Sequence, residues 1–168
     1  MWLQNAGYNT YYTGKLWNAY NVDNFNDPPA GGFNGSEILL DPNTYDYYHP
    51  VLSRNGGAAV DYKGRYSTDL IAEKAYEFLD EATSHDEPFF LGVAPIAPHS
   101  EIRRDPFVSA APEYHERHAN LLKDYKIPRT ANFNPEKVLY NLFFLGFHIH
   151  DIYELKLTEP TAKNSRLG

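Results

Sequence analysis

Residues 88–100 have the sequence PFFLGVAPIAPHS, an apolar run that ends in prolines and a histidine. Its first part, residues 89–93, is a short continuous apolar segment, typical of a strand that is buried on both faces of a sheet. Proline has no amide hydrogen for a neighbouring strand, so Pro95 and Pro98 predict that the strand ends near residue 94. His99 then follows the carboxyl end of a buried strand, where open α/β sheets bind ligands. On position alone, a loop histidine without a role remains the simpler interpretation.

A helix is predicted just before this strand, at residues 66–82. Ser67 or Thr68 could cap it, and Asp69 would lie at the positive end of its dipole. Apolar side chains recur at helical spacing and form a stripe that must pack on the sheet. The stripe consists of Ile71, Ala75, Phe78, Leu79 and Ala82. A helix followed by an apolar strand indicates an α/β architecture.

A second strand is predicted near the start of the chain. Residues 11–13 are β-prone, and Gly14 ends the strand just before Lys15. Lys15 therefore resembles His99 in its position, since each is a basic side chain that follows a short strand. Two such groups suit an anionic substrate carried on a neutral scaffold such as a sugar or a phenol.

The segment from residue 18 to 65 is rich in Asn, Asp, Gly, Pro and Tyr. It predicts a long irregular insertion, with at most short strands at 37–40 and 44–48. Loops of this length inside a compact domain are usually functional. Asn34 begins an Asn-Gly-Ser sequence that fits the N-glycosylation sequon, so it is the predicted glycosylation site.

Composition narrows the classes of partner. The net charge of −7 argues against nucleic acid or an anionic membrane as the main partner. Aromatic residues make up 15% of the chain and suit a polar, sugar-like pocket. The absence of cysteine excludes disulfides, thiolate metal sites and a cysteine nucleophile within these residues. No apolar run approaches the ~20 residues of a membrane span, and the first residues do not read as a signal peptide.

Metal ligation is not the favoured interpretation of the other histidines and acidic residues. His115 and His118 could share a helical face, but a solvated face is favoured because no third ligand is near. His148 and His150 alternate along a predicted strand, also without visible partner ligands. The aspartates of the long insertion are better explained as turn residues: Asp41, Asp46 and Asp61.

With these residues in place, the chain resembles the sulfatase family, in particular fungal arylsulfatases and the N-acetylglucosamine-6-sulfatase group. The segment AGYNTYYTGKLWN at residues 6–18 is similar to the AGY-T-GK segment of that family. The run at 88–100 is similar to its PFF-APH segment. The resemblance extends from about residue 1 to about residue 136 and includes the helix between the two motifs.

The resemblance implies a partial alkaline-phosphatase-like α/β/α sandwich that carries a long irregular insertion and hydrolyses sulfate esters. Lys15 would bind the sulfate oxygens, and His99 would contact the sulfate and the leaving oxygen. Asn18, where many sulfatases have a histidine after the GK pair, would help to bind the substrate. The substrate would be a sulfated small molecule or glycan, and the complete family member would be secreted or vesicular.

The departures from the family are as informative as the matches. Sulfatases use a formylglycine made in a C/S-x-P-S/A-R motif, and the 168 residues contain no such motif. Calcium is expected for the full-length family, but its acidic ligands are not recognisable here. Without the nucleophile there is no covalent sulfate intermediate. We therefore expect residues 1–137 to form an incomplete, inactive catalytic domain, and residues 138–168 to be a disordered or mistranslated segment.

Two alternatives stay open. The chain could be a non-catalytic module that uses Lys15 and His99 to bind sulfate or glycans. It could also belong to a phosphate ester hydrolase, since only the nucleophile distinguishes the two esters. The flanking coding sequence would discriminate: a C/S-x-P-S/A-R segment indicates a sulfatase, and a Thr or Ser nucleophile indicates phosphoryl transfer.

Overall fold

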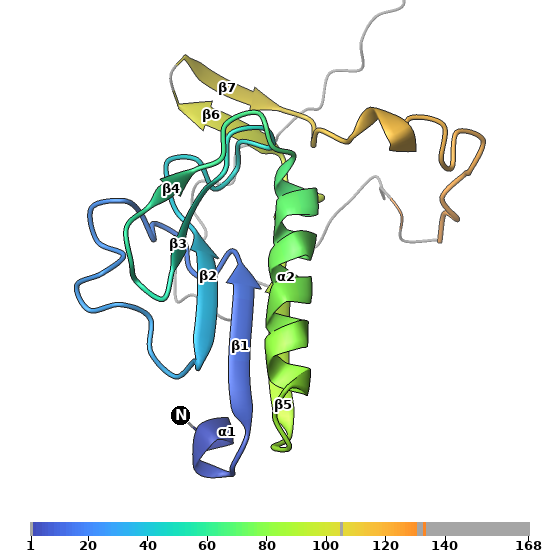
Figure 1. The fold of residues 1–168 in the computed structure, drawn as a ribbon. Coiled ribbons are helices and arrows are strands. Elements are labelled where there is room, and N and C mark those ends of the chain that lie inside the picture. Colours follow the sequence, from blue (N-terminus) through green and yellow to red (C-terminus); the bar gives the residue numbers. More distant parts are fainter. Residues whose placement is uncertain (1, 105, 131–132, 134–168) are drawn as a thin grey trace, which may run out of the picture. The chain divides into compact units, whose positions relative to one another are not determined.

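The computed structural model describes residues 2–104, 106–130 and 133 (Figure 1). The chain divides into two units, Met1–Lys123 and Asp124–Gly168, and the first contains the sheet and the candidate site. In the second unit the Arg129 guanidinium lies 5.1 Å from the centre of the Phe133 ring. The predicted domain boundary at 137, and His148 and His150 beyond it, lie outside the described residues. The boundary therefore stays a prediction.

The first unit is built on a mixed five-stranded sheet with the order β4-β3-β2-β1-β5. Its strands are β1 (Asn9–Gly14), β2 (Gly35–Leu39), β3 (Val51–Arg54), β4 (Val60–Asp61) and β5 (Phe89–Ala94). Strand β1 pairs in parallel with both β2 and β5, whereas the β2–β3 and β3–β4 pairs are antiparallel. Parallel pairing across a helical connection is the arrangement that the α/β prediction requires, and the prediction is confirmed.

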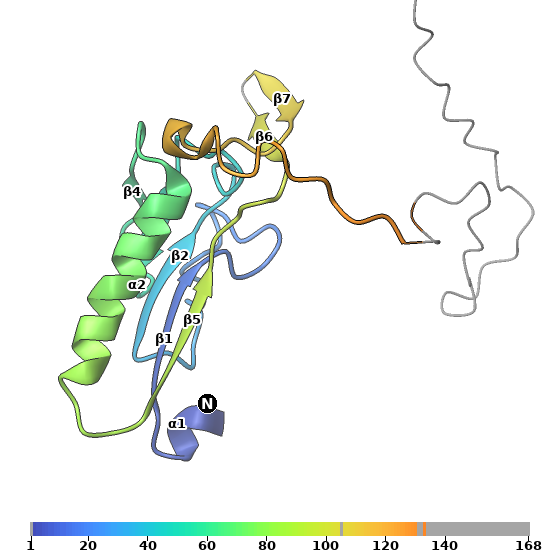
Figure 2. The same ribbon diagram turned by 90° about the vertical axis from the view of Figure 1, so that its right-hand side faces the viewer.

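Helix α2 (Ser67–Thr83) packs on one face of this sheet, against β1 and β5 (Figure 2). Three members of the predicted stripe, Ile71, Phe78 and Ala82, are fully buried. The Phe78 ring lies 5.5 Å from the ring of Tyr11 on β1. Burying such side chains stabilises the fold by about 1.5–3 kcal/mol for each large one.

The predicted cap of α2 is wrong. Tyr66 occupies the N-cap position and no side chain caps the helix. The Ser67 side chain is instead buried, and the Ser67 backbone N donates to the Tyr47 carbonyl at 2.7 Å. Because a carbonyl from the preceding loop satisfies this amide, the helix start is fixed by tertiary contact and not by a local capping residue.

Strand β5 contradicts the prediction of a strand buried on both faces. Phe89, Phe90 and Val93 are 38%, 46% and 47% exposed. In the described part of the chain β5 is an edge strand that pairs with β1 alone. Its Leu91 side chain packs against the cluster of Tyr11, Phe78 and Ala82. An apolar run shows that a strand is suited to burial, but it does not show that other elements cover both of its faces.

The long insertion is more ordered than the sequence predicts. The strand expected at 37–40 is present as β2, while β3 and β4 were not predicted. The strand expected at 44–48 is wrong, because these residues form turns. The Asp46 carboxylate accepts from the Tyr48 backbone N at 3.1 Å, a local bond that competes with strand pairing. Tyr47 is fully buried in the core beneath β2, β3 and α2.

The remaining elements are shorter. They are α1 (Trp2–Asn5), the hairpin of β6 (Glu101–Arg104) and β7 (Phe107–Ala110), and the 3-10 turn η1 (Glu116–His118). The helix on which His115 and His118 could share a face is reduced to η1. Arg117 joins η1 to α2 through two bonds to the Asp69 carboxylate. No helix in the described residues has the length and apolar character needed to cross a membrane.

Candidate functional site

Lys15 is positioned by the close pairing of β1 and β5. Gly14 lies opposite Ala94 in the parallel register, and the Lys15 backbone N donates to the Ala94 carbonyl at 2.9 Å. Gly14 has a φ of 109°, and a Cβ at this position would overlap the Ala94 carbonyl. Only glycine permits this approach, so the strand needs a glycine immediately before Lys15.

The Lys15 side chain is a half-buried ammonium group with a neutral partner. Its Nζ donates to Asn18 Oδ1 at 2.6 Å. Within the described residues it makes no ion pair, whereas Arg54, Lys74 and Arg103 each pair with carboxylates. Lysine has three donors, so Lys15 retains both its charge and N–H groups for an anionic ligand.

Tyr45 contacts all three residues that the sequence predicts to bind substrate. Its ring lies 4.3 Å from the His99 ring at an interplanar angle of 31°. Lys15 Nζ lies 5.8 Å from the centre of the same ring, and the Tyr45 hydroxyl donates to Asn18 Oδ1 at 3.4 Å. The structure therefore places Lys15, Asn18 and His99 around the Tyr45 ring. We call Lys15, Asn18, Tyr45 and His99 the basic cluster.

His99 is held by its backbone and by one ring nitrogen. The Tyr47 hydroxyl donates to the His99 carbonyl at 2.7 Å. Burial raises the pKa of Tyr47, with a smaller contribution from Tyr66, so this hydroxyl stays a neutral donor. His99 Nδ1 lies 2.8 Å from the Ser100 carbonyl, which can only accept, so Nδ1 carries the proton. Nε2 is the nitrogen left to act on a ligand, and the ring is exposed.

Sequence reasoning did not identify Tyr45 or Tyr47 as site residues. Both lie in the stretch that we expected to be a strand, and both are placed by the turns that replace it. The only available signal was the density of tyrosine in a turn-rich loop. That signal does not show which rings reach the ends of β1 and β5, because the answer depends on how the loop crosses the sheet.

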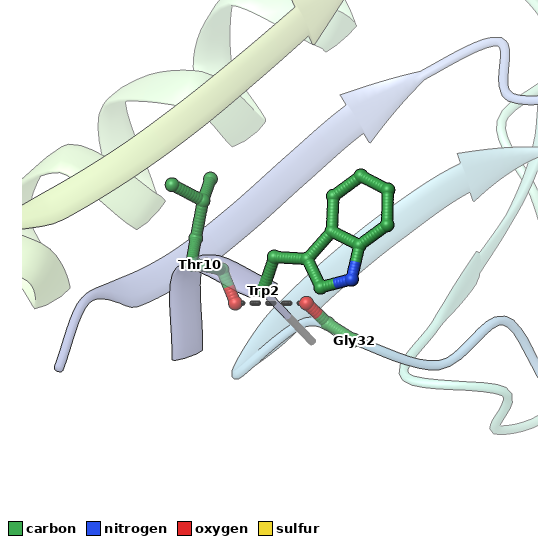
Figure 3. Close-up of a pocket in the computed structure, with 4 residues that line it drawn as sticks. Trp2, Thr10 and Gly32 are labelled. Atoms are coloured by element: carbon green, nitrogen blue, oxygen red, sulfur yellow. Dashed lines mark hydrogen bonds between the residues drawn. The ribbon is translucent and has the colours of Figure 1, made fainter. Parts of the chain in front are cut away.

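Asn34 lies at the opposite end of β1. Its Oδ1 accepts from Thr10 N at 2.9 Å and from Thr10 Oγ1 at 3.1 Å, and its Nδ2 donates to Asn9 Oδ1 at 3.2 Å. A nearby cavity of about 260 Å³ is lined by Trp2, Leu3, Thr10 and Gly32 (Figure 3). Asn34 is exposed but is separate from the basic cluster, and its glycosylation stays a prediction.

A buried carboxyl group lies two residues after His99. Glu101 is 2% exposed, and Arg103 Nε donates to Glu101 Oε1 at 2.9 Å. Burial raises the pKa of Glu101, and the neighbouring Glu113 carboxylate raises it further. The segment that carries His99 therefore continues into an ionisable group inside the protein.

The described residues do not form a calcium site. No three His, Asp or Glu side chains among them come together as ligands. Asp61 is bonded to His49 at 2.9 Å, while His115 and His118 each accept a hydrogen bond from Arg117. Calcium takes six to eight oxygen ligands, and nothing comparable surrounds the basic cluster in this part of the chain.

The chain is similar to known proteins over most of its length. The family profile described as Sulfatase matches residues 1–133. An arylsulfatase of Volvox carteri is 40% identical over 136 residues, covering 76% of this chain and 21% of the relative. The sulfatase ppz1 of Metarhizium majus is 45% identical over 97 residues, covering 58% and 22%. The N-acetylglucosamine-6-sulfatase of Homo sapiens is 36% identical over 138 residues, covering 77% and 22%.

A solved structure supports the fold. It is a complex of a protein with its substrate D-glucosamine-2-N,6-O-disulfate. The TM-score between the two structures is 0.50 and the sequence identity is 28%. The match covers 77% of this chain and 22% of the other. The described residues thus form part of an alkaline-phosphatase-like fold. The chain spans about a fifth of the length of these three sulfatase relatives.

Proposed function

Because this chain belongs to the sulfatase family, we propose that it is part of a sulfuric ester hydrolase and that Lys15, Asn18 and His99 bind the sulfate group. One observation carries the proposal. In a chain of net charge −7, a lysine without an ion pair in the described residues lies beside a histidine with a free Nε2, at the carboxyl ends of two parallel strands. Such a site favours an anion over a cation.

Three residues of the basic cluster have proposed roles in the reaction. Hydrolysis of a sulfate ester breaks the bond between sulfur and the ester oxygen, and the departing oxygen must gain a proton. The imidazolium form of His99 can supply that proton from Nε2. The Lys15 ammonium stabilises negative charge on the non-bridging oxygens, and the Asn18 amide Nδ2 donates to the same group.

The chain as given should bind a sulfate ester without turning it over. No cysteine and no C/S-x-P-S/A-R motif occur in the 168 residues, and the described residues do not fit calcium. Fixed donors contribute roughly 3–4 kcal/mol each to transition-state stabilisation, against the roughly 8–23 kcal/mol that enzymes supply. A nucleophile is therefore indispensable for turnover.

We further propose that the substrate of the complete protein is a sulfated small molecule or glycan. Support comes from relatives that are an arylsulfatase and an N-acetylglucosamine-6-sulfatase, and from the sulfated sugar bound in the structural relative. A secreted or vesicular location and a calcium requirement are part of the same proposal for the complete protein. The alternative of a non-catalytic sulfate-binding module is favoured by one observation, the presence of the basic cluster without a nucleophile.

Sulfate binding tests the proposal directly. The ¹⁵N-labelled chain is titrated with sodium sulfate at constant ionic strength, and affinity is measured from the shifts of the Lys15 and His99 amides. We expect Lys15→Ala and His99→Ala each to weaken binding by about tenfold, since a hydrogen bond to a charged group contributes about 1.5–3 kcal/mol. Lys63→Ala is the matched control; it removes the same charge from the turn after β4, and affinity should change less than twofold.

Two results would count against the proposal. Unchanged sulfate affinity in the Lys15→Ala variant would show that the basic cluster is not the anion site. Hydrolysis of 4-nitrophenyl sulfate by the chain with saturation kinetics, lost in Lys15→Ala, would show that the chain holds a nucleophile that we have not identified. Binding without hydrolysis agrees with both the partial enzyme and the binding module, which the flanking coding sequence separates.

A further inference from the structure

A cavity of about 470 Å³ borders the basic cluster. It is open to solvent and is lined by the first part of the connection between β1 and β2, including Trp17, Asn18, Tyr20, Asn24 and Asp27. Its volume lies within the range of roughly 300–1,000 Å³ typical of small-ligand sites. Asn18 belongs to both places, because the same side chain lines the cavity and accepts from Lys15 Nζ. A group attached to a bound sulfate can therefore enter the cavity directly.

Trp17 gives the cavity a flat apolar wall. Its side chain is 59% exposed, and its ring meets the Tyr20 ring edge-on, with centroids 5.7 Å apart at 88°. Tyr20 is itself buried, and its hydroxyl donates to the Phe25 carbonyl at 2.6 Å. The indole is thus supported on one side and open on the other. Amphipathic aromatic rings of this kind suit the apolar C–H face of a pyranose.

The backbone around the cavity is held by its own hydrogen bonds. Asn24 Nδ2 donates to the Ala19 carbonyl at 3.0 Å, and Asn24 Oδ1 accepts from Asn21 N at 2.9 Å. The Asp41 backbone N donates to the Tyr20 carbonyl at 2.8 Å, which ties this loop to the end of β2. A ligand would therefore meet a largely formed site and would lose less free energy in ordering it.

The polar groups of the cavity favour hydroxyls. Within the described residues, the Asp27 carboxylate has no hydrogen bond or ion pair, and its backbone N alone bonds, to the Asn24 carbonyl at 3.5 Å. A carboxylate only accepts hydrogen bonds, so sugar hydroxyls or an amine can donate to it, and it repels a second anionic group. Asp27 is exposed, so an aryl ring stacked on Trp17 would leave this carboxylate to water, whereas a sugar hydroxyl can donate to it directly.

We propose that this cavity binds the pyranose ring of a sugar sulfate whose sulfate group lies on the basic cluster, with Trp17 stacking on the ring and Asp27 accepting from its hydroxyls. The inference rests on the proposed function and adds the substrate class. It predicts a preference for a monosulfated neutral or amino sugar over a sugar with a second sulfate at the position facing Asp27.

Tryptophan fluorescence provides a direct test. The only other tryptophan is Trp2, which is 92% exposed and precedes the opposite end of β1, so Trp2→Phe leaves Trp17 as the single reporter. In this background we expect glucose 6-sulfate to change the emission and to bind about tenfold more tightly than inorganic sulfate. Inorganic sulfate should bind without changing the emission.

Substitutions separate the ring from the sulfate. Affinities of the variants are measured by NMR, which needs no tryptophan. Trp17→Leu should abolish the advantage of glucose 6-sulfate while leaving the affinity for inorganic sulfate unchanged, and Trp17→Phe should restore part of it. Asp27→Asn should weaken binding of glucose 6-sulfate but not of phenyl sulfate.

The outcomes separate the sugar subsite from the sulfate site. Equal affinities for glucose 6-sulfate and inorganic sulfate would overturn the sugar subsite and leave the sulfate site standing. Tighter binding of phenyl sulfate than of glucose 6-sulfate, with no effect of Asp27→Asn, would replace the sugar by an aryl group. If none of the three ligands binds, the sulfate site and the subsite both fail.

Discussion

At its amino end β1 is bordered by neutral groups that bond to one another, whereas its carboxyl end is bordered by basic groups that make few bonds within the protein. The two asparagines at these ends show the contrast. Asn34 uses both its oxygen and its nitrogen on Asn9 and Thr10. Asn18 uses only its oxygen, toward Lys15 and Tyr45, in the described part of the chain.

The two ends separate residues that stabilise the fold from residues that are available to a ligand. Polar groups that satisfy each other stabilise the protein and have little left for a substrate. A lysine that has only a neutral partner contributes little to stability, and it keeps most of its capacity to bind an anion. By this criterion the amino end of β1 is structural and the carboxyl end is the candidate site.

The largest effect that tests this contrast comes from the glycines that flank β1. Gly14→Ala should destabilise the first unit by roughly 3 kcal/mol, because a Cβ there overlaps the Ala94 carbonyl and the residue has a positive φ. Gly7→Ala is the matched control: Gly7 also has a positive φ, 86°, but nothing lies within 4 Å of an added Cβ. It should cost only about 1 kcal/mol.

Urea denaturation followed by circular dichroism measures both variants. Equal destabilisation by the two substitutions would show that β1 and β5 do not approach each other as closely as described, and the placement of Lys15 would then be wrong.

The asparagines provide the next test. Asn34→Ala should reduce the free energy of unfolding by about 1–3 kcal/mol, because it leaves the Thr10 amide without its acceptor. Asn18→Ala should change it by less than about 0.5 kcal/mol, as expected for an exposed position. In the sulfate titration Asn18→Ala should have the larger effect, because only this substitution removes a group that binds the anion. A large loss of stability in Asn18→Ala would contradict the distinction between the two ends.

The smallest expected effect concerns pH. The folded state raises the pKa of Glu101 above its ordinary 4.5, so the protonated form favours folding. That contribution is present below pH 4.5 and is lost as pH rises through the raised folded pKa. Glu101→Gln should therefore be more stable than the original chain at about pH 7, and the difference should shrink toward about pH 4.

Glu116→Gln, an exposed substitution of the same kind in η1, is the control for this measurement and should show no such trend. Urea midpoints from about pH 4 to about pH 7 give the comparison. If Glu101→Gln is less stable than the original chain at neutral pH, the bond from Arg103 outweighs burial and the sign of our argument is wrong.

The sequence was sufficient to predict the elements that carry local signals. The apolar spacing in residues 66–82 predicted α2 almost to its ends, because helical periodicity is a property of one segment. Gly14 before Lys15 and the prolines before His99 predicted where two strands end. That these ends are adjacent depends on the parallel pairing of β1 and β5, which is not a property of either segment alone.

Long-range pairing accounts for what the sequence could not provide. Strand β4 has only two residues and exists through its pairing with β3, so it has no pattern of its own. Tyr45 reaches His99 from a distant part of the chain, and no local preference encodes that contact. The predicted N-cap of α2 was wrong for the same reason, since the Tyr47 carbonyl, and no capping side chain, accepts from the first amide of the helix.

The exposed edge of β5 has a consequence for how this chain behaves in solution. A row of amides and carbonyls that no strand pairs with in the described residues, flanked by Phe90 and Val93, is a template on which the same strand of another molecule can add. Because such addition is bimolecular, it accelerates with protein concentration. The strand that leads to His99 would then nucleate intermolecular sheets, and the usable concentration of the soluble chain would be limited by the same segment that presents its histidine.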